Sequence, residues 1–251
     1  MVQKIKVGAV SYLNAKPLIY GFEQGGMKES LNLFIDYPAN IASLLINDQI
    51  DIGLVPVAII PSLNEHYIIS NFCIGCDGEV ASVCLFSDVP LHEIKTILLD
   101  YQSRTSVELL KILLKEHWDI SPGLVKASAN YEDEIGTTTA GLVIGDRALN
   151  QRLKSKYIYD LGSAWKEMTG LPFVFATWVS NKKLPAGFID EFNNVNEIGL
   201  KAIDVIVQQQ QHPLYNLHKY YTENISYRLD EEKEKGMQLF LQKAVFINNI
   251  K

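Results

Sequence analysis

The sequence alternates short apolar segments with longer amphipathic segments, and this alternation restricts the possible folds more than any other feature. Residues 4–10, 33–35 and 51–55 are short and rich in apolar and β-branched side chains, which predicts strands. Residues 17–23 and 38–45 lie between them and carry apolar side chains at helical spacing. The order strand, helix, strand, helix, strand favours a parallel sheet covered by helices.

A second alternation of the same kind follows. Residues 96–99, 124–125 and 141–145 are expected to be strands, and residues 105–118 an amphipathic helix. Residues 131–135 are a candidate for a short helix. Two such units predict an α/β protein with two similarly built lobes.

Two further apolar segments flank the second unit. Residues 81–87 and 173–179 are both expected to be strands, which suits a two-strand hinge between the lobes. The expected division places residues 1–88 and 176–251 in the first lobe and residues 89–175 in the second.

The C-terminal part of the chain is predicted to be helical. Residues 189–209 and 231–247 carry helical patterns and are expected to pack on the first lobe. Together these features predict the architecture of bilobed ligand-binding proteins, whose ligands lie at the carboxyl ends of the strands.

Composition narrows the classes of partner. The chain has 251 residues, of which 47% are hydrophobic, and this is enough for a substantial core. A net charge of −6 without a basic stripe argues against nucleic acid. No segment approaches the roughly 20 apolar residues of a membrane span, and no secretory signal pattern is present. We therefore expect a cytoplasmic protein without a membrane partner. The sequence does not indicate the oligomeric state.

The cysteines raise the question of metal or redox chemistry. Cys73 and Cys76 have C-x-x-C spacing, and Cys84 follows nearby. No second pair or group of histidines completes a zinc set. The glycines and aspartate around Cys76 indicate a turn, whereas a thioredoxin-like motif would begin a helix. We expect three reduced structural thiols and no metal.

The first expected strand ends in small polar residues before a helix. Such a place offers free backbone N–H groups and the positive end of a helix dipole to an anion. Ser11, Tyr12 and Asn14 lie there, and the Asn14 amide supplies both a donor and an acceptor. Alternatively, Asn14 only caps the helix. We expect residues 11–18 to form one wall of a cleft for a small anionic molecule.

Two more strand ends are expected at the same cleft. Thr105 and Glu108 fit a capping box, and Arg104 before them could grip a carboxylate or simply lie exposed. Gly145 and Asp146 follow the strand at residues 141–145 and could present an N–H or a carboxylate. The alternative is a helix cap by Asp146 followed by a solvated Arg147.

Familiar catalytic motifs are missing from the sequence. It contains no nucleophile elbow, Walker loop, dinucleotide fingerprint or H-E-x-x-H motif. The five histidines, at positions 66, 92, 117, 212 and 218, are expected to be solvated. Ser82, in an apolar strand, needs a polar partner that a ligand could provide. These residues alone predict no more than the binding of a small anion.

Several ordered motifs resemble the chorismate dehydratases of the futalosine route to menaquinone. The similarity runs in order from Val10 to Ala176 and is looser beyond. Its motifs are Val10-Ser11-Tyr12-Leu13-Asn14-Ala15-Lys16-Pro17-Leu18, Asp51-Ile52-Gly53-Leu54-Val55-Pro56, Cys73-Ile74-Gly75, Ser82-Val83-Cys84-Leu85-Phe86-Ser87, Ser103-Arg104-Thr105-Ser106-Val107, Ile144-Gly145-Asp146, Asp160-Leu161-Gly162, Trp165, and Thr169-Gly170-Leu171-Pro172-Phe173-Val174-Phe175-Ala176.

This resemblance implies a type II periplasmic-binding-protein fold that has been turned to catalysis. It implies the removal of water from chorismate to give 3-[(1-carboxyvinyl)oxy]benzoate, without a metal or organic cofactor. Asn14 and Ser82 are the implied catalytic contacts. With the strand-end argument, the expected substrate-binding residues are Ser11, Tyr12, Arg104, Thr105, Ser106, Gly145 and Asp146.

The sequence leaves some alternatives open. The base could be Asp146 or the enolpyruvyl carboxylate of the substrate itself. One alternative function is that of the 1,4-dihydroxy-6-naphthoate synthase of the same pathway, a family that uses a histidine at the cleft. The other is a non-catalytic binding protein for a small carboxylate. No histidine stands at a matching strand end, and no secretory signal is seen, so both rank lower.

Overall fold

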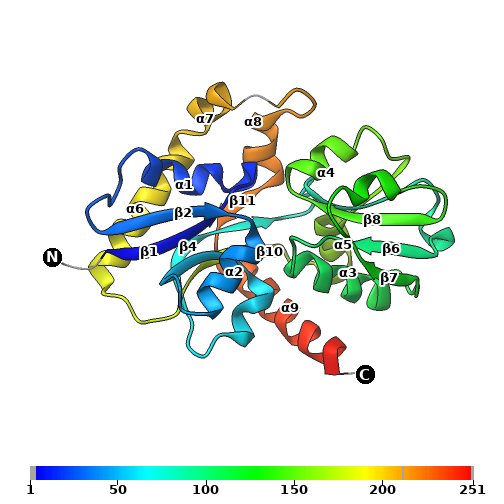
Figure 1. Cartoon of the computed structure of the whole chain (residues 1–251), viewed down its shortest axis with the longest axis horizontal. Coiled ribbons are helices and arrows are strands. Elements are labelled where there is room, and N and C mark those ends of the chain that lie inside the picture. Colours follow the sequence, from blue (N-terminus) through cyan, green and yellow to red (C-terminus); the bar gives the residue numbers. More distant parts are fainter. Residues whose placement is uncertain (1–3, 211, 250–251) are drawn as a thin grey trace.

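The protein consists of two α/β lobes side by side (Figure 1), in a computed structural model that describes residues 4–210 and 212–249. The first lobe is built on a six-stranded sheet with the order β11-β4-β10-β3-β1-β2. The second lobe is built on a five-stranded sheet with the order β7-β6-β8-β5-β9. The predicted class, two α/β lobes, is confirmed.

The first lobe begins with the predicted alternation of strands and helices. Its elements are β1 (Ile5–Val10), α1 (Lys16–Glu23), β2 (Leu31–Asp36), α2 (Pro38–Ile46) and β3 (Ile52–Pro56). Strand β1 is parallel to both β2 and β3, as the alternation predicts. Proline stands in the first turn of α1 and of α2, where its fixed φ suits a helix and its missing N–H removes no hydrogen bond.

Three antiparallel strands complete the first sheet: β4 (Tyr67–Cys76), β10 (Phe173–Ser180) and β11 (Ser226–Arg228). The turn expected around Cys76 begins only after it, because Gly75 belongs to β4. A Cβ atom on Gly75 would lie 2.7 Å from the carbonyl oxygen of Phe173. This glycine therefore permits a close backbone approach and does not mark a turn.

The second lobe contains the second predicted alternation. Its elements are β5 (Val83–Ser87), β6 (Thr96–Leu99), α3 (Thr105–Glu116), β7 (Gly123–Lys126), β8 (Thr139–Ile144), α4 (Asp146–Gln151), β9 (Tyr157–Asp160) and α5 (Leu161–Thr169). Strand β6 is parallel to β7 and β8, whereas β5 is antiparallel to β8 and β9. The segment after Asn130 forms one short 3-10 turn, Tyr131–Glu134.

The expected lobe boundaries need correction. Strand β5 pairs within the second sheet, and β10 pairs within the first sheet from Phe173 onward. The chain therefore changes sheet within residues 77–82 and 161–172, and not at the expected boundaries near residues 88 and 176. Both expected hinge strands exist, but an apolar strand pattern cannot reveal which sheet a strand joins.

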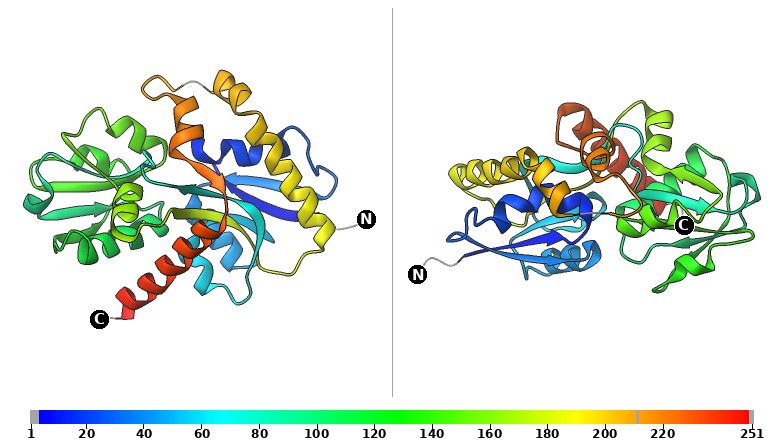
Figure 2. Two further views of the ribbon diagram at one scale, coloured as in Figure 1. Left: turned by 180° about the vertical axis from the view of Figure 1, so that it is seen from behind. Right: turned by 90° about the horizontal axis from the view of Figure 1, so that it is seen from above.

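The C-terminal helices are α6 (Ala186–Lys201), α7 (Ile203–Gln209), α8 (Leu217–Lys219) and α9 (Glu231–Asn249), with a π-helical turn, η5 (Tyr220–Asn224), after α8. Helix α9 contacts α3 of the second lobe as well as β10, so it does not pack on the first lobe alone (Figure 2). The Phe240 ring lies 5.1 Å from the ring of Phe173 and 6.3 Å from that of Trp165. No helix among the described residues is both long and apolar enough to cross a membrane.

The three cysteines are free and buried, as expected of structural thiols. Cys73 and Cys76 both lie in β4. Side chains an odd number of positions apart on a strand point to opposite faces, so this spacing does not bring the two thiols together. Burial raises the pKa of the Cys73 thiol to about 12, which keeps it protonated.

Candidate functional site

A cavity lies between the two lobes, at the carboxyl ends of β1, β3 and β8. Five of the predicted site residues line it: Tyr12, Asn14, Thr105, Ser106 and Gly145. The other lining residues are Val10, Pro38, Pro56, Ile74, Val80, Val83, Ser103, Ile144, Phe175 and Ala176. Residues from all three expected strand ends therefore line one cavity.

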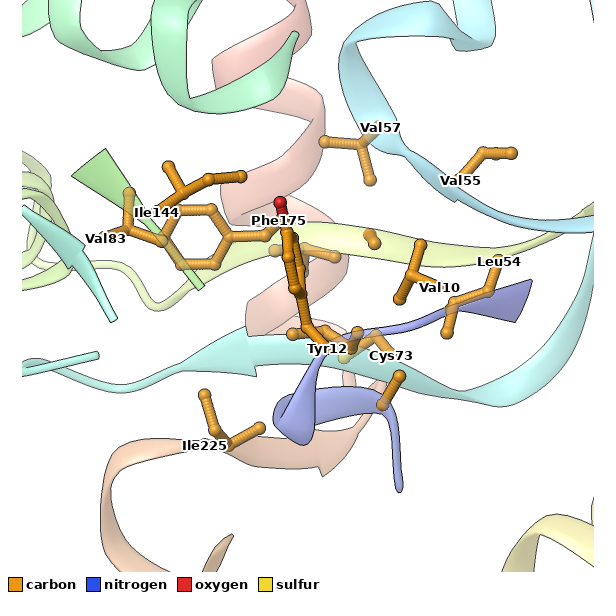
Figure 3. Packing of buried hydrophobic residues seen from close by; sticks show 14 of the residues in the cluster. Val10, Tyr12, Leu54, Val55, Val57, Cys73, Val83, Ile144, Phe175 and Ile225 are labelled. Atoms are coloured by element: carbon orange, nitrogen blue, oxygen red, sulfur yellow. The ribbon is translucent and has the colours of Figure 1, made fainter. Parts of the chain in front are cut away.

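The cavity lining is apolar with a few neutral polar groups. Figure 3 shows Tyr12 beside Phe175, with Val83 and Ile144 on the side of the second lobe. None of the lining residues carries a formal charge. An anion bound here would have to be held by hydroxyl, amide and backbone N–H groups.

Asn14 lies in a short 3-10 turn, η1 (Leu13–Ala15), whose backbone is held from two sides. The Leu13 N–H donates to Asp146 Oδ1 over 3.1 Å, and the Tyr227 hydroxyl donates to the Asn14 carbonyl oxygen over 2.9 Å. The Asn14 side-chain oxygen is buried and has no hydrogen-bond partner within residues 4–210 and 212–249.

An unpaired buried acceptor is costly, so the Asn14 amide is a candidate for binding a ligand. The alternative that Asn14 only caps a helix is wrong. Ala15 is the residue before α1, and no side chain caps that helix.

The N-terminus of α3 also faces the cavity. Ser103 Oγ accepts a hydrogen bond from the Ser106 N–H over 3.1 Å, so Ser103 provides the side-chain cap. Thr105 Oγ1 instead accepts from the Ala58 N–H of the first lobe over 3.2 Å. The predicted capping box is therefore wrong, but the helix does begin at Thr105. Its dipole and first N–H groups suit a carboxylate.

Four of the predicted site residues lie outside the cavity lining, and two of these, Arg104 and Ser11, are exposed. Arg104 is exposed, and its Nη2 donates to Ser43 Oγ of α2 over 3.3 Å. Ser11 is exposed, and its N–H donates to the Asp36 carbonyl oxygen. Arg104 extends across the lobe interface toward α2, so the prediction that it grips a carboxylate in the cavity is not supported.

Gly145 is required by the close approach of the lobes. Its φ is +63°, and a Cβ atom would lie 3.0 Å from the Tyr12 ring. Asp146 begins α4, but its carboxylate binds the Leu13 N–H and is not part of the lining. Burial raises the pKa of the Asp146 carboxyl.

Ser82 is fully buried and is not part of the lining, although it lies between two lining residues, Val80 and Val83. The Tyr220 hydroxyl donates to Ser82 Oγ over 2.7 Å. Burial raises the pKa of Tyr220 well above its usual value, so this phenol stays protonated. Because Tyr220 supplies the proton of that bond, the Ser82 hydroxyl keeps its own proton for another acceptor.

The sequence did not indicate a polar network that holds Tyr12. The Tyr12 hydroxyl donates to Gln102 Oε1, which also accepts from Arg147 Nη2 over 3.1 Å. Arg147 further binds Asp100 and Glu132 over 2.6 Å each, so it is ion-paired and not a solvated side chain. Tyr220 and Tyr227 were missed as well. All these partners are far apart in the chain, so no local pattern could reveal them.

The fold and the interlobe cavity define a bilobed protein with periplasmic-binding-protein architecture. A protein from Archaeoglobus fulgidus has a similar structure, with a TM-score of 0.72 and 15% identity over 98% of both chains. The periplasmic aliphatic sulphonate binding protein SsuA from Escherichia coli gives a TM-score of 0.61 and 12% identity, over 99% of this chain and 93% of its own.

A sequence profile described as menaquinone biosynthesis matches residues 5–245, so the chain belongs to this family. A chorismate dehydratase from Thermus thermophilus is 26% identical over 267 aligned positions, covering 94% of this chain and 93% of the relative. A chorismate dehydratase from Campylobacter jejuni is 25% identical over 155 positions, covering 60% of this chain and 69% of the relative.

Proposed function

We propose that this protein is a chorismate dehydratase. It would eliminate water from chorismate to give 3-[(1-carboxyvinyl)oxy]benzoate in the futalosine route to menaquinone. The observation that carries the proposal is the buried amide oxygen of Asn14, which has no partner among the described residues and belongs to the lining of the interlobe cavity. As an acceptor it suits a ligand hydroxyl, such as the one that chorismate loses. Membership of the menaquinone biosynthesis family and the two similar dehydratases support it.

The cavity fits the chemistry of chorismate, a dianion with an apolar ring. Phe175, Val83 and Ile144 offer apolar surface to the ring. Ser103, Ser106 and the N-terminus of α3 offer neutral donors to a carboxylate. Holding both parts in one orientation would supply much of the rate, because the elimination then starts from an aligned geometry.

The elimination breaks one ring C–H bond and one C–O bond, and the ring becomes aromatic. Asn14 and the Ser82 hydroxyl proton would hydrogen-bond the departing hydroxyl and the charge that develops on it. The Asp146 carboxylate already accepts a hydrogen bond from the Leu13 N–H, so we favour the enolpyruvyl carboxylate of the substrate as the base. No electrons pass to an external acceptor, and the proposal invokes no organic cofactor.

We also propose a cytoplasmic location. The three free cysteines agree with a reducing compartment, where disulfides are rare.

The direct test is to incubate the purified protein with chorismate. We expect the absorbance of an aromatic product and a mass lower than that of chorismate by one water. Binding of chorismate without turnover would instead identify a binding protein and overturn the proposal. The naphthoate synthase alternative is disfavoured because the described residues that line the cavity include no histidine.

A further inference from the structure

The chain crosses from the first lobe to the second through a strained turn. The Ser82 N–H donates to the Val80 carbonyl oxygen over 2.8 Å, which closes a three-residue γ-turn. Its central residue, Ala81, is fully buried and has a φ of +64°. A side chain with a Cβ atom rarely adopts this conformation, which persists only where surrounding contacts enforce it.

One carboxylate supplies most of these contacts. Asp160, the last residue of β9, accepts from the Val80 N–H over 3.1 Å and from the Ala81 N–H over 2.8 Å. The Ala81 carbonyl oxygen in turn accepts from Arg152 Nη1 over 3.1 Å. Asp160 also accepts from the Ser163 N–H over 3.0 Å at the start of α5. The two segments that connect the lobes, residues 77–82 and 161–172, therefore both donate hydrogen bonds to the Asp160 side chain.

The turn determines where part of the cavity wall lies. Val80 and Val83, on either side of Ala81, line the cavity. The Ser82 carbonyl oxygen accepts from the N–H of Gly145, another lining residue, over 2.8 Å. A shift of the turn would therefore move both valines, Gly145 and the Ser82 hydroxyl together.

We propose that Asp160 is a positioning residue for the dehydration. Its carboxylate holds Ala81 in the left-handed conformation and thereby places Ser82 and the neighbouring valines against the substrate. This inference rests on the proposed dehydratase function. Asp160 itself does not line the cavity and acts through the turn.

The decisive experiment combines two substitutions. In Asp160→Asn an NH2 group replaces one carboxylate oxygen, so either Val80 or Ala81 loses its acceptor. We expect kcat to fall on the order of 10- to 100-fold, with a smaller change in KM. Ala81→Gly alone should leave kcat within about twofold, because glycine adopts a positive φ without strain.

The double variant Ala81→Gly/Asp160→Asn should then recover most of the lost kcat, because its turn no longer needs the carboxylate. A merely structural role of Asp160 would not produce this rescue.

Asp51→Asn is the matched control. The Asp51 carboxylate also accepts a backbone N–H, that of Lys6 over 2.8 Å, but it lies outside the cavity lining. Its kcat should stay at the wild-type value. Full kcat in Asp160→Asn, or no rescue in the double variant, would overturn the inference.

An inactive wild-type protein would refute the proposed function. Amide hydrogen exchange would then still test whether Asp160 holds the turn at Ala81. Faster exchange of the Val80 and Ala81 amides in Asp160→Asn, but not in Asp51→Asn, would support the role of Asp160 in holding the turn. Equal exchange in the two variants would refute it.

Discussion

Asn14 presents an amide oxygen that forms no hydrogen bond with any residue that the structure describes. The residue is 9% exposed, and its backbone is held by Tyr227 and, through Leu13, by Asp146. Removing the amide therefore breaks no hydrogen bond of that oxygen. The NH2 group of the same side chain can donate to a developing anion. We predict that Asn14→Ala lowers kcat by about 100- to 1000-fold, the loss typical of such a donor.

The melting temperature of Asn14→Ala should stay close to that of the wild type. Steady-state kinetics and thermal unfolding check both parts. Unchanged turnover would show that Asn14 does not contact the reacting atoms.

The Asp146 carboxyl should make the stability of the folded protein depend on pH. Burial raises the pKa of its carboxyl in the folded protein, so the ionised form costs stability. This cost is absent below the unfolded pKa of about 4 and grows as the pH rises through the folded pKa. Asp146→Asn carries no charge and keeps an oxygen for the Leu13 N–H.

We therefore predict that Asp146→Asn is more stable than the wild type at pH 7, and that this advantage shrinks as the pH falls toward about 4. Urea unfolding at several pH values measures it. Turnover should stay near the wild-type rate. A loss of about 100-fold or more would instead make Asp146 the base.

At the scale of the element, the N-terminus of α3 depends on Ser103. Its hydroxyl caps the helix through the Ser106 N–H and also lines the cavity. We predict that Ser103→Ala destabilises the protein by about 1 kcal/mol and lowers Tm by about 2–4 °C. It should also raise KM, because an anion loses a donor at this helix end.

The matched control is Ser103→Thr, which keeps the hydroxyl and should retain both Tm and KM. If Ser103→Ala and Ser103→Thr melt at the same temperature, the cap does not contribute to stability.

The local sequence pattern was enough to predict several of the strands and helices. The alternation up to Pro56 and the strand ends at Val10 and Ile144 follow from periodicity and proline placement, and both of these strand ends line the cavity. Sheet membership did not follow from the pattern. Strand β5 is uniformly buried, and such a strand can join either sheet.

The partners of the site residues could not be predicted for a similar reason. Tyr220 lies 138 positions from Ser82, and Tyr227 lies 213 positions from Asn14. Only the folded chain brings them together. For Arg104 the sequence instead suggested a contact that the structure lacks. Arginine often binds carboxylates and Arg104 is adjacent in sequence to lining residues, but its side chain contacts Ser43 outside the cavity.

For the whole molecule, the two lobes are joined directly across the cavity. Tyr12 of the first lobe donates to Gln102 of the second, and the Ala58 N–H donates to Thr105. The Leu13 N–H of the first lobe likewise donates to Asp146 of the second lobe. These bonds hold the lobes together around the cavity. Separation of the lobes would break these bonds, so their strength affects how much the lobes open around the cavity.

The bond between Tyr12 and Gln102 can be removed with little other change. Tyr12→Phe keeps the ring that packs against Gly145, and Gln102 Oε1 still accepts from Arg147. We predict that the arrangement with the two lobes joined across the cavity loses about 1 kcal/mol of stabilising free energy. This corresponds to about a fivefold rise in KM, whereas kcat should stay within about twofold of the wild-type value. Small-angle scattering of the ligand-free protein should show a larger radius of gyration.

Tyr37→Phe is the matched control. The exposed Tyr37 ring lies 6.5 Å from the Tyr12 ring, but its hydroxyl is not part of the contact between the lobes. Its KM and radius of gyration should equal those of the wild type. If Tyr12→Phe also matches the wild type in both measurements, the hydroxyl bond to Gln102 does not hold the lobes closed. Closure would then depend on the backbone bonds to Thr105 and Asp146.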